Sequence, residues 1–98
     1  MTITNEKNGN QMTVGIEGRL DTTTAPQLES FLNDNTAGIT DIVLDLEKLE
    51  YISSAGLRVV LSLHKKMCRI GSLKLINASD EVMEVFDITG FSDILTIE

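Results

Sequence analysis

The chain has few of the residues that would signal covalent cross-links, secretion or membrane insertion. Its 98 residues include one cysteine, one proline and no tryptophan. A single cysteine, Cys68, excludes an internal disulfide and a cysteine-pair metal site, and it is expected to be a small buried apolar residue in a reducing compartment. No apolar run approaches the ~20 residues that span a bilayer, and the N-terminus lacks a basic and apolar signal sequence. We therefore expect a soluble, cytoplasmic protein without membrane insertion.

Basic residues are also scarce. Eight lysines and arginines stand against 15 aspartates and glutamates, which gives a net charge of −7. No cluster of lysine and arginine in the sequence is long enough to follow a phosphate backbone, so direct binding to nucleic acid is not expected. A chain of this length with 42% apolar residues can bury one core but not two. We expect one domain over residues 1–98.

Groups for catalysis or cofactor binding are missing as well. The only histidine, His64, lies ten positions after Ser54, and ten residues of continuous helix separate two side chains by ~15 Å, too far for proton transfer. The sequence has no Gly-x-Ser-x-Gly elbow, no phosphate-binding loop and no His/Cys/Asp cluster with metal-ligand spacing. We therefore expect no enzymatic activity, no metal and no cofactor, and a packing role for His64 at the edge of an apolar stripe.

The first part of the chain predicts a hairpin and a helix. Residues 2–7 and 11–17 flank Asn8-Gly9-Asn10, a turn sequence that tolerates positive φ, and the second segment alternates apolar with polar residues. Thr24-Ala25-Pro26-Gln27 matches a capping box, in which the Thr and Gln side chains satisfy each other's backbone donors. A helix with a narrow apolar stripe is therefore expected to begin near Thr24 and to end within residues 33–38.

The middle of the chain predicts a buried strand followed by a long helix. Residues 42–46 form a nearly continuous, β-branched apolar run, which indicates a central strand covered on both faces. After a connection over residues 47–50, apolar residues recur at helical spacing. The predicted stripe consists of Leu57, Val60, Leu61, His64 and Cys68, and it is widened by Val59, Leu63, Met67 and Ile70. Gly71 is placed to end this helix.

The C-terminal third adds a strand, a helix and a tail. Residues 73–76 form another apolar run, Ser79 opens a helix whose first turn is acidic, and Gly90 ends it. The apolar residues at positions 91, 94, 95 and 97 are expected to anchor a short terminal strand or tail. Strands that alternate with helices after a hairpin predict an α/β domain, with a mixed sheet and crossover helices packed on it.

The segment from Tyr51 to Leu57 says most about function, because two adjacent hydroxyls and a glycine stand where a strand gives way to a helix. Ser53 is the better candidate for the helix cap, which makes Ser54 the first helical residue. Ala55 and Gly56 are small, so a partner can approach the backbone of this turn closely. Since a helix start favours negative charge, phosphorylation of Ser54, anion binding and simple capping all stay open on these grounds.

Four short pieces of the sequence stand in a recognisable order. They are Gly18 to Asp21, Ile42 to Leu46, Ser54 to Leu57, and Thr89 to Phe91. They resemble four features of the STAS domain of anti-sigma factor antagonists. The first piece resembles the Gly-x-Leu-Asp sequence before the first helix, and the second resembles the apolar strand. The third resembles the phosphorylation turn, and the fourth resembles the glycine with its aromatic neighbour near the end of the domain. The resemblance covers nearly the whole chain and implies a single STAS-like domain over residues 1–98.

The resemblance implies a protein that switches between partners. The unphosphorylated form binds an anti-sigma factor, usually a serine kinase, and frees the sigma factor; phosphorylation of the turn serine ends that binding, and a serine phosphatase reverses it. By position the phosphorylated serine is Ser54, and Ser53, where many members have aspartate, is a second candidate acceptor. The implied partner-binding residues are Asp21, Thr22, Thr23, Ser53, Ser54, Ala55, Gly56 and Arg58. For Asp21, an equal alternative is that it orients the turn before the first helix.

Two other classes of function also stay open. A small-anion or nucleotide-binding module would hold its ligand on the N–H groups of Ser54 to Gly56, although no basic residue is evident near this turn. An accessory subunit of a transporter or of a stress-signalling assembly would use the same domain as a stable component, since STAS domains also occur there.

Overall fold

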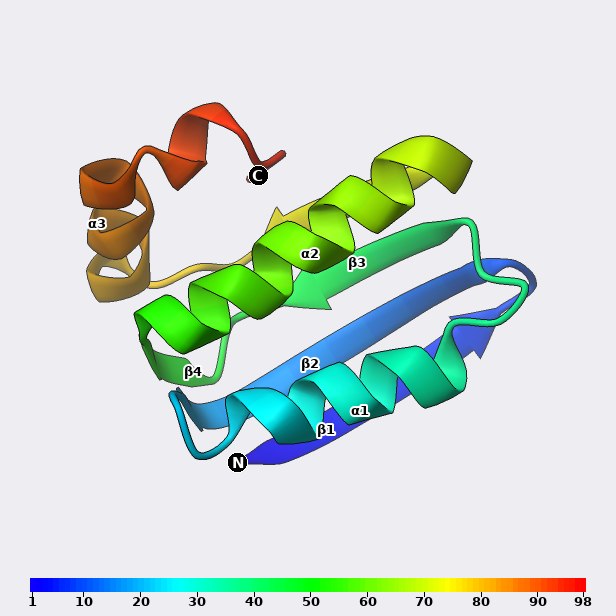
Figure 1. Ribbon diagram of the computed structural model, residues 1–98, viewed down its shortest axis with the longest axis horizontal. Coiled ribbons are helices and arrows are strands. Elements are labelled where there is room, and N and C mark those ends of the chain that lie inside the picture. The colour runs from blue at the N-terminus through cyan, green and yellow to red at the C-terminus, as the bar shows by residue number, and fades with distance from the viewer.

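A mixed sheet of five strands forms one layer of the protein, and two helices lie across one of its faces (Figure 1). The computed structural model describes residues 1–98. In chain order the elements are β1 (Thr2–Asn8), β2 (Gln11–Leu20), α1 (Ala25–Asn35), β3 (Asp41–Asp45), β4 (Leu49–Ile52), α2 (Ser54–Ile70), β5 (Ser72–Ile76), α3 (Asp80–Thr89) and the 3-10 helix η1 (Phe91–Asp93). This α/β arrangement is the predicted one. None of the helices combines the length and the apolar character that crossing a membrane requires.

The sheet is organised around β2, its longest strand. β1 runs antiparallel to β2 through a turn at Gly9, whose φ of 66° suits glycine, so the predicted hairpin is confirmed. On the other side of β2, β3 and then β5 are added in parallel, and β4 pairs with the C-terminal end of β2. The strand over residues 42–46 therefore has the predicted interior position, as β3 between β2 and β5.

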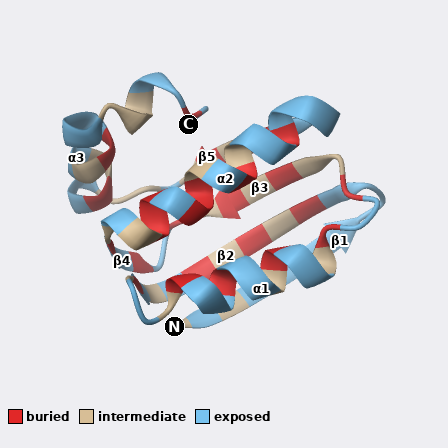
Figure 2. Ribbon diagram, viewed as in Figure 1, coloured by how far each residue is buried: buried red, intermediate tan, exposed pale blue.

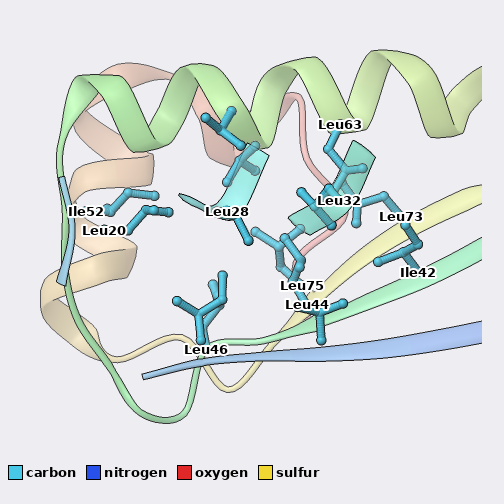
Figure 3. Packing of buried hydrophobic residues seen from close by; sticks show 14 of the residues in the cluster. Leu20, Leu28, Leu32, Ile42, Leu44, Leu46, Ile52, Leu63, Leu73 and Leu75 are labelled. Carbon is cyan, nitrogen blue, oxygen red and sulfur yellow. The ribbon is translucent and has the colours of Figure 1, made fainter. Parts of the chain in front are cut away.

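A core of 23 buried residues fills the space between the sheet and its helices, and Figure 3 shows part of this packing. Along β3 the burial alternates, because Ile42 and Leu44 lie in the core while Val43, on the opposite face, is only half-buried. The prediction that this strand is covered on both faces is wrong. The third helix, α3, packs beside β4 at the end of the sheet and leaves the second face without a helix (Figure 1).

A short strand that the sequence did not reveal follows β3. Residues 47–50 are predicted as a connection, but Leu49 to Ile52 form β4 and pair with β2. Leu49 and Ile52 are buried, and the two residues between them are exposed. Because β4 leads directly into α2, its pairing with β2 fixes the place where that helix begins.

Helix α1 begins where the sequence predicts, but without the predicted capping box. The side chain of Thr24, the residue before the helix, makes no capping hydrogen bond. Its hydroxyl instead donates to the carbonyl of Arg19 at 2.7 Å and accepts from the backbone N–H of Asp21 at 2.8 Å. The capping box is therefore wrong, because the loop before the helix already occupies the Thr24 hydroxyl.

The wide apolar stripe predicted for α2 is confirmed over most of its length and wrong at its end, where Ile70 is half-exposed. The buried residues are Gly56, Leu57, Val59, Val60, Leu63 and Met67. His64 lies at the half-buried edge, as predicted, but Cys68 is exposed, so the prediction of a buried cysteine is wrong. Cys68 follows the last buried residue, Met67, and belongs to the exposed end of the helix over residues 68–70. Figure 2 shows the alternation of buried and exposed residues along α2.

Gly71 ends α2 as predicted, for a reason that the sequence does not show. A Cβ at this position would lie 1.6 Å from the carbonyl oxygen of Thr40. The N–H of Ser72 donates to the same carbonyl at 2.9 Å. The end of α2 therefore lies directly on the backbone that precedes β3, and only glycine fits there.

The C-terminal part agrees with the prediction in outline. Ser79 caps α3 by accepting a backbone N–H at 3.2 Å, and Gly90 ends the helix with a φ of 80°. Ile97 then forms a parallel bridge to Leu75, which covers the outer edge of β5. Ile94 is 48% exposed, so its predicted role as an apolar anchor is wrong.

Candidate functional site

The two adjacent serines at the junction of β4 and α2 have different surroundings. The backbone of Ser53 is extended, and its Oγ accepts a hydrogen bond from the N–H of Gly56 at 3.5 Å. Ser54 is the first residue of α2, and its side chain is exposed and makes no hydrogen bond within the protein. The prediction that Ser53 is the cap and Ser54 the first helical residue is confirmed. The Ser54 hydroxyl is thus the more accessible of the two.

Gly56 holds this turn against the end of β2. A Cβ at position 56 would lie 2.7 Å from Leu20 Cγ and 3.0 Å from both Leu20 O and Ile52 Cγ1. The sequence suggested that Ala55 and Gly56 leave the backbone open to a partner. Ala55 is instead half-buried and Gly56 is buried, because the first turn of α2 packs on Leu20. Gly56 therefore positions the turn and adds little surface to it.

The loop between β2 and α1 is ordered by Asp21. Its Oδ1 accepts from the Thr23 hydroxyl at 2.7 Å, from the Thr23 N–H at 3.0 Å and from the Thr24 N–H at 3.2 Å. The bond from the Thr23 hydroxyl is the main cause that holds the pKa of the Asp21 carboxyl below its usual 3.8, although desolvation acts in the opposite direction. Asp21 thus has the orienting role, and the loop presents Thr22 and Thr23 to solvent.

One backbone hydrogen bond joins this loop to the serine turn. The N–H of Ser53 donates to the carbonyl of Leu20 at 2.9 Å. Leu20 directly precedes Asp21 and Ser53 directly precedes Ser54. Two segments that are about 30 residues apart in the sequence therefore meet at one end of the sheet, as the resemblance led us to expect.

A contact between Arg19 and Tyr51 completes this end of the sheet. The two residues are partners in the parallel pairing of β2 and β4, and the Arg19 guanidinium lies 4.3 Å from the centre of the Tyr51 ring. Arg19 Nε is also 3.8 Å from Asp21 Oδ2. This contact was not predicted, because it depends on the pairing of β4, a strand that the sequence did not reveal.

Arg58 adds a second guanidinium near the serine turn. It is exposed and lies four residues after Ser54 on α2, and residues four apart lie on the same side of a helix. The expectation that no basic residue stands near this turn is therefore wrong. The spacing of Ser54 and Arg58 would have shown this from the sequence, once the start of the helix was fixed at Ser54.

The hollows of the surface lie elsewhere. The largest, of about 260 Å³, is on the face of the sheet without helices and is lined by residues of β1, β2, the end of β3 and the connection from β3 to β4. A second, of about 40 Å³, lies between α1 and α2. No residue from Tyr51 to Leu57 lines any of the three hollows. No three His, Cys, Asp or Glu side chains are placed so that they could hold a metal ion.

Comparison with protein families and curated proteins gives a consistent result. The family model described as "STAS domain" matches residues 2–98. The protein BtrV of Bordetella bronchiseptica is 38% identical over 99 residues, which cover 99% of this chain and 85% of that protein. The anti-sigma-B factor antagonist of Bacillus subtilis is 36% identical over 93 residues, which cover 94% of this chain and 85% of that protein.

Solved structures share the fold. The crystal structure of an anti-sigma factor antagonist from Mycobacterium paratuberculosis superimposes with a TM-score of 0.88 at 22% identity, over 98% of this chain and 83% of the other. The unphosphorylated form of the anti-sigma factor antagonist SpoIIAA gives a TM-score of 0.83 at 21% identity, over 99% of this chain and 88% of the other. At these identities the likeness concerns the fold.

Proposed function

Because the chain belongs to the STAS domain family, we propose that it is an anti-sigma factor antagonist that acts by partner switching. Its unphosphorylated form binds an anti-sigma factor that is also a serine kinase, and so releases the sigma factor. Phosphorylation of Ser54 ends this binding, and a serine phosphatase reverses it. The chain is then the substrate of both enzymes and has no catalytic role of its own. Support comes from a relative with 36% identity that is named as an anti-sigma-B factor antagonist.

The observation that carries the assignment to Ser54 is that the Ser53 hydroxyl caps α2 whereas the Ser54 hydroxyl is free. A kinase needs a hydroxyl that it can reach and orient in line with the transferred phosphoryl group. Ser54 offers such a hydroxyl, since it is exposed and forms no hydrogen bond within the protein. The Ser53 hydroxyl would first have to release the N–H of Gly56, so Ser53 is the second candidate.

The partner-binding surface in this proposal combines the turn and the loop beside it. Ser53, Ser54 and Ala55 contribute the turn, Arg58 the next turn of α2, and Asp21, Thr22 and Thr23 the loop. Gly56 contributes by allowing α2 to pack against Leu20. The backbone bond between Ser53 and Leu20 supports this grouping, because it joins the loop to the turn.

Magnitudes indicate that the phosphate acts on the interface and not on the fold. A phosphate adds ~1.5 to 2 negative charges, and the start of a helix favours negative charge by ~0.3 to 2 kcal/mol. Against a partner, two like charges ~4 Å apart repel by about 4 kcal/mol at an effective dielectric constant near 20. Since 1.4 kcal/mol is about a tenfold change, even half of this repulsion would weaken the complex more than tenfold.

The test is to recover the protein from its native cells with its partners and to locate any phosphate by fragment mass spectrometry. We expect a kinase-like anti-sigma factor bound to unphosphorylated protein, and phosphate on Ser54 in the unbound fraction. The Ser53→Ala and Ser54→Ala proteins form a matched pair, and only the second should lose the phosphate. A Ser54→Ala protein that is still phosphorylated to full stoichiometry would contradict the assignment.

A further inference from the structure

Helix α2 differs in charge from the rest of the chain. It carries four of the eight lysines and arginines and none of the 15 aspartates and glutamates. By contrast, α1 and α3 carry acidic residues and no basic ones. Although the sequence shows no long basic run, half of the positive charge lies on one helix of an acidic protein.

Most of this charge lies along one line of the helix surface. Ser54, Arg58, Ser62, Lys65 and Arg69 follow each other at intervals of three or four residues, and all five are exposed. Such intervals place side chains on one side of a helix, and the opposite side of α2 is buried on the sheet (Figure 2). We call these five residues the outer α2 stripe.

The three cations of the outer α2 stripe have no acidic partner. The ion pairs of the protein join Arg19 to Asp21 and Lys74 to Glu98, and neither involves α2. Lys66, the fourth cation of α2, donates to the Thr36 hydroxyl at 3.1 Å and lies beside α1. Since α2 contains no carboxylate at all, Arg58, Lys65 and Arg69 stay available to a surface of opposite charge.

We propose that the outer α2 stripe is part of the surface that binds the anti-sigma factor, and that the facing surface of this partner is acidic. The inference rests on the proposed function, which places the partner at Ser54, the first residue of the stripe. Charge complementarity of this kind fixes the register of a complex and speeds its formation. DNA and anionic membranes carry negative charge over an extended surface, which would also face the acidic remainder of a protein with a net charge of −7. An acidic protein surface of limited area can face the stripe alone.

The stripe also explains how one phosphate could release the partner. A phosphate on Ser54 adds negative charge at the head of the stripe, opposite the carboxylates of the partner. Arg58, one turn along, is in position to pair with this phosphate. The phosphate therefore repels the partner and also withdraws one of the cations that binds it.

The test uses the anti-sigma factor that co-purifies with the protein and measures its Kd by calorimetry at several salt concentrations. The triple variant Arg58→Gln/Lys65→Gln/Arg69→Gln should bind at least ~10-fold more weakly and with a shallower salt dependence, because it lacks the attracting charges. Lys7→Gln/Lys48→Gln/Lys74→Gln is the matched control, since it removes the same charge from positions outside α2 and should bind like the wild type. Thermal unfolding verifies that both triples are folded.

Phosphorylation gives a second measurement. In the Arg58→Gln protein a phosphate on Ser54 should weaken binding by a smaller factor than in the wild type, because the cation that it withdraws is already absent.

Equal weakening of partner binding by the two triple variants would overturn the inference, as would an α2 triple variant that binds like the wild type. If an α2 triple variant that binds like the wild type still loses the partner on phosphorylation, the proposed function is supported and only the role of the outer α2 stripe in binding is contradicted. If the α2 triple variant weakens binding but phosphorylation does not, the role of the outer α2 stripe is supported and the phosphorylation switch is contradicted.

Discussion

Ser53 accepts a hydrogen bond from the N–H of Gly56, and this bond makes Ser53 the cap of α2. The cap occupies one serine and leaves its neighbour, Ser54, exposed on the first turn. Ser53 therefore stabilises the turn, and Ser54 offers the hydroxyl that can react. Substitutions at the two positions test these two roles separately.

The Ser53→Ala variant should be less stable than the wild type by about 0.5 to 1 kcal/mol, because an N-cap hydroxyl contributes in this range. The Ser54→Ala variant loses no hydrogen bond and should stay within about 0.5 kcal/mol of the wild type, as exposed positions usually do. Urea unfolding of both proteins measures the difference. Equal stability of the two variants would contradict the cap.

The Gly56→Ala variant should be destabilised by about 1 to 3 kcal/mol, as is usual when a side chain is forced into a packed site. Its Cβ would lie 2.7 Å from Leu20 Cγ and 3.0 Å from the Leu20 carbonyl oxygen. Alanine otherwise favours a helix over glycine by ~1 kcal/mol, so the sign of the change is informative. The control is Ser62→Ala, at an exposed position of the same helix, which should be neutral or stabilising.

The pKa of Asp21 should be below 3.8 in a carbon NMR titration of the carboxyl groups. Because the folded-state pKa is lowered, ionised Asp21 stabilises the fold above the unfolded value, and this contribution is lost as the pH falls through the folded-state pKa. The Thr23→Ala variant removes the main cause and should raise the Asp21 pKa toward 3.8. Thr22→Ala removes a neighbouring hydroxyl that makes no bond to Asp21 and should leave the pKa unchanged.

The contact of Arg19 with Tyr51 should appear in a double-mutant cycle. An exposed guanidinium over an aromatic ring contributes about 0.5 to 1 kcal/mol. We expect a coupling of this size from the unfolding free energies of Arg19→Gln, Tyr51→Ala and the double variant. Tyr51→Phe keeps the ring and should preserve the coupling. A coupling of zero would mean that the stacking at 4.3 Å contributes nothing to stability.

Partner binding should depend on the charge at position 54. We expect Ser54→Ala to bind the anti-sigma factor like the wild type and Ser54→Asp to bind more weakly, with true phosphorylation weaker still by more than about tenfold. The control Ser30→Asp places the same charge on an exposed position of α1. If both aspartate variants weaken binding equally, the effect is one of net charge and not of position.

Features that depend on neighbouring residues were predicted well from the sequence. The hairpin turn at Gly9, the cap at Ser53 and the end of α3 at Gly90 each depend on a few adjacent residues, and the structure has all three. The mixed sheet with crossover helices followed from the alternation of strands and helices, since parallel strands need crossover connections.

Features that depend on distant contacts were missed. β4 is short and becomes a strand through its pairing with β2, so Arg19 and Tyr51 gave no signal of their contact. The capping box failed because the Thr24 hydroxyl bonds the backbone of the preceding loop. Cys68 was placed in the core because it extended an apolar pattern, but the buried face of α2 ends at Met67 and residues 68–70 are exposed.

The hydrogen bond from Ser53 N–H to the Leu20 carbonyl has a consequence for the speed of exchange between partners. It ties the serine turn to the loop of Asp21, so the two segments are already in place before any partner arrives. A surface set in advance loses little conformational entropy on binding. The protein can then dissociate from one partner and bind another without any refolding step. Which partner is bound depends on the chemical state of a single hydroxyl.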